Sequence, residues 1–86
     1  MSGLDLLAGG ALGAWAIRTA PPALVRQVVC LDEALVGVAA ERGHEIFAGD
    51  PHQAAFAPAG AALSVDFPLV LRPELIDLRR GDLEHP

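Results

Sequence analysis

The sequence predicts an α/β fold: a Rossmann-like parallel sheet of about four strands with helices on both faces, truncated relative to a full sheet. Three observations support this prediction. Short apolar runs recur along the chain, separated by segments whose apolar residues have helical spacing. Within the runs, apolar and polar residues do not alternate, which is typical of strands covered on both faces. Glycine, proline or aspartate stands at most boundaries, where turns and helix caps favour these residues.

The first strand–helix pair occupies the beginning of the chain. Residues 4–8 form a short apolar run that ends in two glycines, so we expect a strand and a tight turn there. Residues 11–20 are expected to form a helix, and the following two prolines end it. Its apolar stripe is predicted to contain Leu12, Trp15 and Ala16, which have helical spacing.

The second pair follows the prolines. Residues 25–31 are rich in β-branched side chains and predict a strand. Asp32 is placed to cap the next helix, and Gly43 stands where a left-handed C-terminal cap is expected. The apolar stripe of that helix is predicted to consist of Leu35, Val38 and Ala39.

The second half of the chain predicts two further strands. Residues 45–48 form a short third strand. The run Asp-Pro-His-Gln at 50–53 has a capping-box pattern, which predicts a helix carrying residues 54–56. Residues 61–65 predict the fourth strand, and a last short helix is expected over 73–78, opened by proline.

Composition limits the classes of function. The chain has 86 residues, so we expect one domain over 1–86. Hydrophobic residues make up 52% of it, which is high for so small a domain and favours a missing partner or a missing half. The net charge is −5 and all six basic residues are arginine, so nucleic-acid binding by this segment is not expected.

The location predicted from the sequence is cytoplasmic. Residues 4–17 lack the basic start of a signal peptide, and Asp5 interrupts their apolar run. No apolar run has the length needed to span a bilayer, so no membrane association is expected. Cys30 lies within an apolar run and is predicted to be a small core residue in a reducing compartment. The three histidines show no metal-ligand spacing, so no metal site is predicted.

In an open parallel sheet, ligands bind beyond the carboxyl ends of the strands. The positions that meet this condition are 9–10, 32–33, 50 and 66–71. The turn over 8–13 is close to the dinucleotide fingerprint G-x-G-x-x-G, with alanine in place of the first glycine, and Asp32 follows at about the distance expected of a ribose-binding acid. The alternative is structural: the glycines make a tight turn and Asp32 only caps a helix.

Residues 64–76 carry a more specific pattern, Ser-Val-Asp-Phe-Pro-Leu-Val-Leu-Arg-Pro-Glu-Leu-Ile. This stretch resembles the folate-binding loop of the formyltransferases. The resemblance extends over residues 4–86, since 6–13 look like the family's first strand and glycine turn and 39–47 like its second helix and third strand. It implies a pocket for 10-formyltetrahydrofolate, the formyl donor. The residues that would form it are Phe67, Pro68, Leu69, Val70 and Leu71, with Gly9 and Gly10 at the glycine turn. Plain core packing after a strand is the alternative for the 67–71 loop.

The resemblance also shows what this chain lacks. The family uses an Asn-x-His pair and a later Asp to transfer the formyl group to an amine. Here His85-Pro86 matches the family's His-Pro, but Leu83 stands in place of the asparagine and the chain contains no Asn. By the resemblance, His85 is the remaining catalytic candidate; the alternative is a solvated terminal histidine. We therefore expect the chain to be inactive alone.

Three functions are compatible with these patterns. The first is the folate-binding half of a formyltransferase, which a complementary polypeptide would complete. The second is a small dinucleotide-binding module that uses Gly9, Gly10, Gly13 and Asp32. The third is a non-catalytic interaction domain that covers its open sheet edge by dimerising with itself.

Overall fold

The computed structural model describes residues 3–53 and 55–69 of the chain. It contains a single parallel sheet together with two α-helices and a short 3-10 helix. The predictions that lie outside the described residues are the helix over 73–78 and the site residues Val70, Leu71 and His85.

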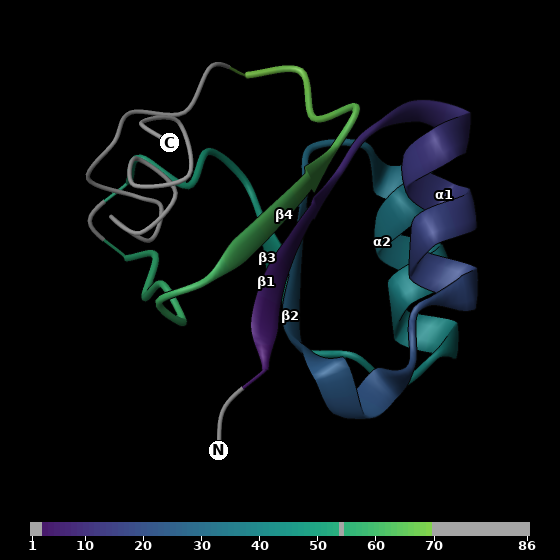
Figure 1. Cartoon of the computed structure of the whole chain (residues 1–86). Helices are drawn as coiled ribbons and strands as arrows, with labels where there is room; N and C mark the ends of the chain where they lie inside the picture. Colours follow the sequence, from purple (N-terminus) through teal and green to yellow (C-terminus); the bar gives the residue numbers. More distant parts are fainter. Residues whose placement is uncertain (1–2, 54, 70–86) are drawn as a thin grey trace, which may run out of the picture.

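The sheet has four parallel strands in the order β3-β2-β1-β4 (Figure 1). The strands are β1 (Leu4–Ala8), β2 (Val25–Cys30), β3 (Ile46–Ala48) and β4 (Ala62–Val65). Each lies within one residue of its predicted bounds. Strand β1 is central, because it pairs with β2 on one side and with β4 on the other. The predicted Rossmann-like parallel α/β fold is therefore confirmed.

Helices α1 (Gly10–Thr19) and α2 (Glu33–Glu41) pack against each other on one face of the sheet (Figure 1). A 3-10 helix, Pro22–Leu24, leads from α1 into β2. The apolar side chains between the helices and the sheet form the larger hydrophobic cluster, and they include Leu6, Ala8, Ile17, Val28, Cys30 and Leu35. The lone cysteine is thus a core residue, as predicted.

The predicted apolar stripe of α1 was wrong in part. Leu12 and Trp15 are 58% and 60% exposed, whereas Gly13, Ala16 and Ile17 are buried. The close contact of α1 with β1 explains the difference, because a Cβ atom on position 13 would lie 3.0 Å from the Cβ of the alanine that ends β1. A glycine at this position lets the helix backbone approach the strand and directs the 13–16–17 face inward. Sequence spacing alone does not distinguish that face from the 12–15 face.

The predicted ends of α2 are confirmed. Oδ1 of Asp32 accepts a hydrogen bond from the backbone N–H of Ala34 at 2.9 Å, which caps the helix. Gly43 has a φ of 78° and donates to the carbonyl of Ala40, while the N–H of His44 donates to the helix carbonyl five residues earlier. These two bonds are the Schellman pattern, which satisfies carbonyl groups at the helix end. On the inner face Leu35 and Ala39 are buried and Val38 is half-buried.

Helices were predicted on both faces of the sheet, but among the described residues the opposite face is covered by the segment that links β3 to β4, which contains no α-helix. The capping-box pattern at 50–53 predicted a helix there, but residues 51–53 and 55 form turns instead, so this prediction was wrong. Oδ1 of Asp50 does accept from the N–H of His52, and Phe56 then donates to the carbonyl of Gln53. The contacts of this segment with the sheet explain why no helix forms. About a dozen residues must cross from one sheet edge to the other, over three strand spacings of about 4.8 Å each, and turns place Phe56 on the sheet.

Phe56 is the centre of the smaller hydrophobic cluster on this face. It is buried against Leu7 of β1 and Val29 of β2. Its ring meets that of Phe47 edge to face, with centroids 5.1 Å apart and an interplanar angle of 62°. Burial of these rings outweighs the helix signal of residues 50–53.

A buried carboxylate fixes the same segment to the sheet. Asp5 on β1 is 1% exposed. Its Oδ1 accepts from Nε2 of Gln27 at 2.8 Å and lies 3.7 Å from the Arg26 guanidinium. Its Oδ2 accepts from the backbone N–H of Ala59 at 2.8 Å, and Gln27 also donates to the carbonyl of Ala57. These bonds attach residues 57–59 to the centre of the sheet.

Within residues 3–53 and 55–69, the two α-helices are too short to cross a lipid bilayer.

Candidate ligand-binding cleft

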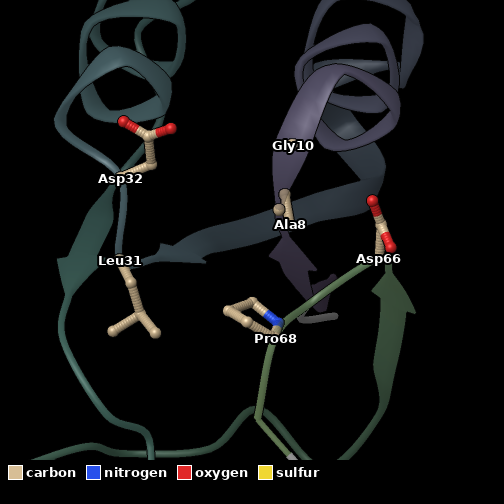
Figure 2. A pocket seen from close by; sticks show the side chains of 7 residues that line it. Ala8, Gly10, Leu31, Asp32, Asp66 and Pro68 are labelled. Carbon is tan, nitrogen blue, oxygen red and sulfur yellow. The ribbon is translucent and has the colours of Figure 1, made fainter.

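A cleft opens at the carboxyl ends of three strands, β1, β2 and β4 (Figure 2). Its volume is about 370 Å³, within the range of small-molecule sites. It lies where the strand order reverses direction, between β1 and β4, which is the usual ligand position in open parallel sheets. The described residues that line it are Ala8, Gly9, Gly10, Leu31, Asp32, Asp66 and Pro68.

The turn from β1 to α1 forms the floor of the cleft. The N–H of Gly9 donates to the carbonyl of Val65 at 3.0 Å, which extends the pairing of β1 with β4. A Cβ atom on Gly9 would overlap the main-chain carbonyl oxygen of Asp66, so this position requires glycine. Gly10 has a φ of 62°, a left-handed conformation that also favours glycine. The two glycines make the tight turn that both interpretations require, and both line the cleft.

Helix α1 begins at this turn without a side-chain cap. Among the described residues no side chain caps the helix at Gly9, and the first turn of α1 contains no acidic residue. The first N–H groups of a helix have no partner within the helix, and they carry the positive end of its dipole. The start of α1 therefore presents partial positive charge at the cleft.

Asp66 brings a carboxylate to the start of α1. Figure 2 shows this side chain directed toward the first turn of the helix, and a Cβ atom on Gly10 would lie 3.0 Å from Oδ2 of Asp66. Asp66 follows β4 directly and has a φ of 57°. This left-handed conformation is uncommon for residues other than glycine, although Asp and Asn adopt it more readily than most. The main-chain bend turns the carboxylate toward the helix.

Asp32 approaches the cleft from the end of β2. Its Oδ1 caps α2, and among the described residues no other hydrogen bond to this carboxylate occurs. Oδ2 is therefore available to accept from a ligand hydroxyl. The Asp32 charge also acts on the neighbouring Cys30: burial first, and then this negative charge, raise the pKa of the thiol. Cys30 stays protonated and is not a nucleophile at neutral pH.

The structure brings some of the predicted site residues together and separates others. Gly9, Gly10, Pro68 and Asp32 meet in the cleft, although they are distant in sequence. The other residues have different surroundings. Phe67 packs against the Phe56 cluster, Gly13 packs against β1, and Leu69 is half-buried and does not line the cleft.

Two residues of the cleft were not assigned a role from the sequence. Asp66 follows the carboxyl end of a strand, where ligands bind in open parallel sheets. From the sequence, however, only the apolar residues after it were interpreted as a pocket. The sequence signal that could have identified Asp66 is its position as a polar residue directly after the last strand. Leu31, the other one, directly precedes the helix cap and is 45% exposed, which gives the cleft an apolar side.

The remaining strand end, after β3, holds an aspartate–histidine pair. Oδ1 of Asp50 lies 2.8 Å from Nδ1 of His52 and also accepts the His52 backbone N–H. Neither residue lines the cleft.

Comparison of the chain with profiles of protein families, with curated proteins and with solved structures gave no match.

Proposed function

We propose that this chain is a binding module that holds a ribose-bearing ligand of the nucleotide class in the cleft between β1, β2 and β4. One observation carries the proposal: the glycine turn that begins α1 and the carboxylate at the end of β2 line the same cleft. In the dinucleotide-binding arrangement, an acid at the end of the second strand accepts hydrogen bonds from ribose hydroxyls. Asp32 occupies that position here.

The chemistry of the cleft supports binding of this kind. Leu31 and Pro68 supply apolar surface for a flat ring, and Oδ2 of Asp32 supplies a charged acceptor for a pair of hydroxyl groups. A carboxylate accepts such bonds about twice as strongly as a neutral group.

Two substitutions at the start of α2, a test and a control, examine the proposed contact between Asp32 and the ribose. Asp32→Asn keeps an N-cap acceptor, so α2 should remain capped. It removes the charge that strengthens the ribose bonds, and we expect the affinity for adenosine to fall about tenfold, which corresponds to about 1.4 kcal/mol. Glu33→Gln removes the same charge from the adjacent residue, which does not line the cleft, and should leave the affinity unchanged. Titration calorimetry of the full chain measures both.

Equal affinities for the wild-type chain and the Asp32→Asn variant would contradict the proposed ribose contact. Thermal melts provide a second readout, because a ligand that binds only the folded state stabilises it by about 2.7 kcal/mol at a hundred times its Kd.

A second candidate ligand is a reduced folate. The observation that favours it is that Pro68, part of the loop that resembles the pterin-binding stretch, lines the cleft together with Gly9 and Gly10. Phe67 of the same loop is half-buried and packs against the Phe56 cluster instead. A melt with excess 5-formyltetrahydrofolate separates the two candidates: a shift by folate alone would support the formyltransferase-like proposal, and a shift by adenosine or NAD alone would support the nucleotide proposal.

A further inference from the structure

Phosphate groups in sheets of this type are held at the start of the first helix. The glycine turn lets the backbone approach the phosphate, and the free N–H groups and helix dipole stabilise its charge. In this chain two oxygen atoms of Asp66 border that position. The main-chain carbonyl oxygen lies against the α-carbon of Gly9, and Oδ2 lies 3.0 Å from the place where a Cβ of Gly10 would be.

These two oxygens limit which ligand groups can bind at the start of α1. At Gly9 the carbonyl oxygen of Asp66 occupies the direction in which a side chain would lie, so a ligand cannot approach the α-carbon from that direction. On the Gly10 side, the carboxylate already provides the negative charge that the helix dipole favours. A phosphate placed there would have to displace this carboxylate or lie beside it, and two like charges at such a separation repel each other.

The rest of the cleft adds to this repulsion. Asp32 contributes a second carboxylate, and no arginine or histidine is among the described residues that line the cleft. Sites that recognise phosphate usually supply Arg or Lys to offset its charge. Among residues 3–53 and 55–69, the 5′ side of a bound nucleoside therefore faces negative charge, and no basic side chain of the described cleft offsets it.

From this arrangement we infer that the cleft selects a nucleoside without phosphate, uncharged or cationic at its 5′ position, and that Asp66 determines this selection. The inference rests on the proposed function and narrows its ligand class. In this arrangement Asp32 binds the ribose hydroxyls, and Asp66 excludes anionic 5′ substituents and attracts cationic ones.

The test is a series of adenosine derivatives that differ only at the 5′ position. Titration calorimetry of the full chain compares adenosine, AMP, ADP and 5′-amino-5′-deoxyadenosine, whose ammonium group is cationic at neutral pH. We expect adenosine and the amino derivative to bind more tightly than AMP and ADP, by roughly fivefold or more at low salt.

Asp66→Asn isolates the contribution of the carboxylate, because Asn also adopts the left-handed conformation of this residue. We expect this variant to bind ADP roughly fivefold more tightly than the wild-type chain does, with the adenosine affinity within about twofold. Asp66→Gly also suits the φ of 57° and serves if the first variant folds poorly. Glu45→Gln removes one charge at the amino end of the sheet and controls for net charge, so its ADP affinity should not change.

The measured affinities can overturn the inference in three ways. Tighter binding of ADP than of adenosine by the wild-type chain would overturn the inference and leave the proposed function intact. An equal gain in ADP affinity from Asp66→Asn and Glu45→Gln would overturn the role of Asp66, since net charge would then explain the gain. If no member of the series binds to the wild-type chain or to either Asp66 variant, the proposed function fails and the inference fails with it.

Discussion

At the scale of single residues, glycines with different surroundings show which positions the fold restricts. The α-carbon of Gly9 faces the carbonyl oxygen of Asp66, so any side chain there collides with main chain that cannot move independently of β4. Gly37 lies within α2, and a Cβ atom on it would have no heavy atom within 4 Å. Both residues are glycine, but only the first needs to be.

Alanine substitutions should therefore have opposite effects at these two positions. Gly9→Ala should lower the free energy of unfolding by about 1–3 kcal/mol through backbone strain. Gly37→Ala should raise it by about 0.5–1 kcal/mol, because alanine favours a helix interior relative to glycine. Urea denaturation of both variants checks this, and a stable Gly9→Ala protein would contradict the described packing of the β1–α1 turn.

His44 makes stability depend on pH. Burial first, and the nearby Arg42 charge second, lower its pKa below the ordinary value of 6.5. Its Nε2 atom is buried and has no hydrogen-bond partner among the described residues, so protonation would bury a donor without an acceptor.

The sign of the His44 effect follows from its proton binding. Between the lowered pKa and 6.5 the unfolded chain binds more protons than the folded one, so stability rises with pH through this window and is lower below it. His44→Gln should remove this contribution. Urea denaturation from pH 5 to pH 8 measures it, and the same pH slope in the variant would show that another group is responsible.

At the scale of elements, sequence patterns predicted the strands and the ends of α2 because those signals are local. The Asp32 cap and the Gly43 terminus act within one helical turn, and the apolar runs set the strands. The patterns failed at residues 50–53 and at the α1 face, where the outcome depends on distant residues. The packing of Phe56 on the sheet overrode a local helix signal, and the approach of α1 to β1 selected its inward face. The contact of Asp66 with the glycine turn depends on β1–β4 pairing, which a motif search does not detect.

The buried Asp5 holds the segment that links β3 to β4 against the sheet. Asp5→Ala leaves the N–H of Ala59 without its acceptor and removes one of the two acceptors of the Gln27 amide. We expect the free energy of unfolding to fall by about 2–4 kcal/mol. Asp5→Asn keeps one acceptor oxygen and should lose less. Hydrogen exchange at the Ala59 amide is the local measurement: protection should fall in Asp5→Ala, and unchanged protection would show that the apolar cluster alone holds this segment.

At the scale of the whole molecule, the two edge strands of the described sheet differ in length and in the exposure of their large apolar side chains. Strand β4 forms one edge and contains no charged residue, and its Leu63 is 50% exposed. Strand β3, at the other edge, has only three residues. Long uncharged edges favour pairing between chains, whereas short or charged edges oppose it. The expectation that the chain dimerises through its open edge remains a prediction, and β4 is the edge to test.

Leu63→Lys should weaken such an association, because a charge on an edge strand opposes pairing. Leu24→Lys is the matched control, since Leu24 is similarly exposed at 56% but belongs to the 3-10 helix before β2. Sedimentation velocity over a range of concentrations measures both. A monomeric wild-type chain at high concentration, or equal weakening by both substitutions, would exclude β4 as the contact.

The central position of β1 also has a consequence for the order in which the molecule folds. Strand β1 pairs with β2 after a single helix, but its other partner, β4, comes near the end of the described chain. Pairing of distant segments closes a long loop and is slow relative to local pairing. The β1-α1-β2 unit should therefore form first, with β1 exposed along one side until β4 arrives. Since β4 and Asp66 complete the cleft, the cleft is among the last features to form, and ligand binding during refolding would report the arrival of β4.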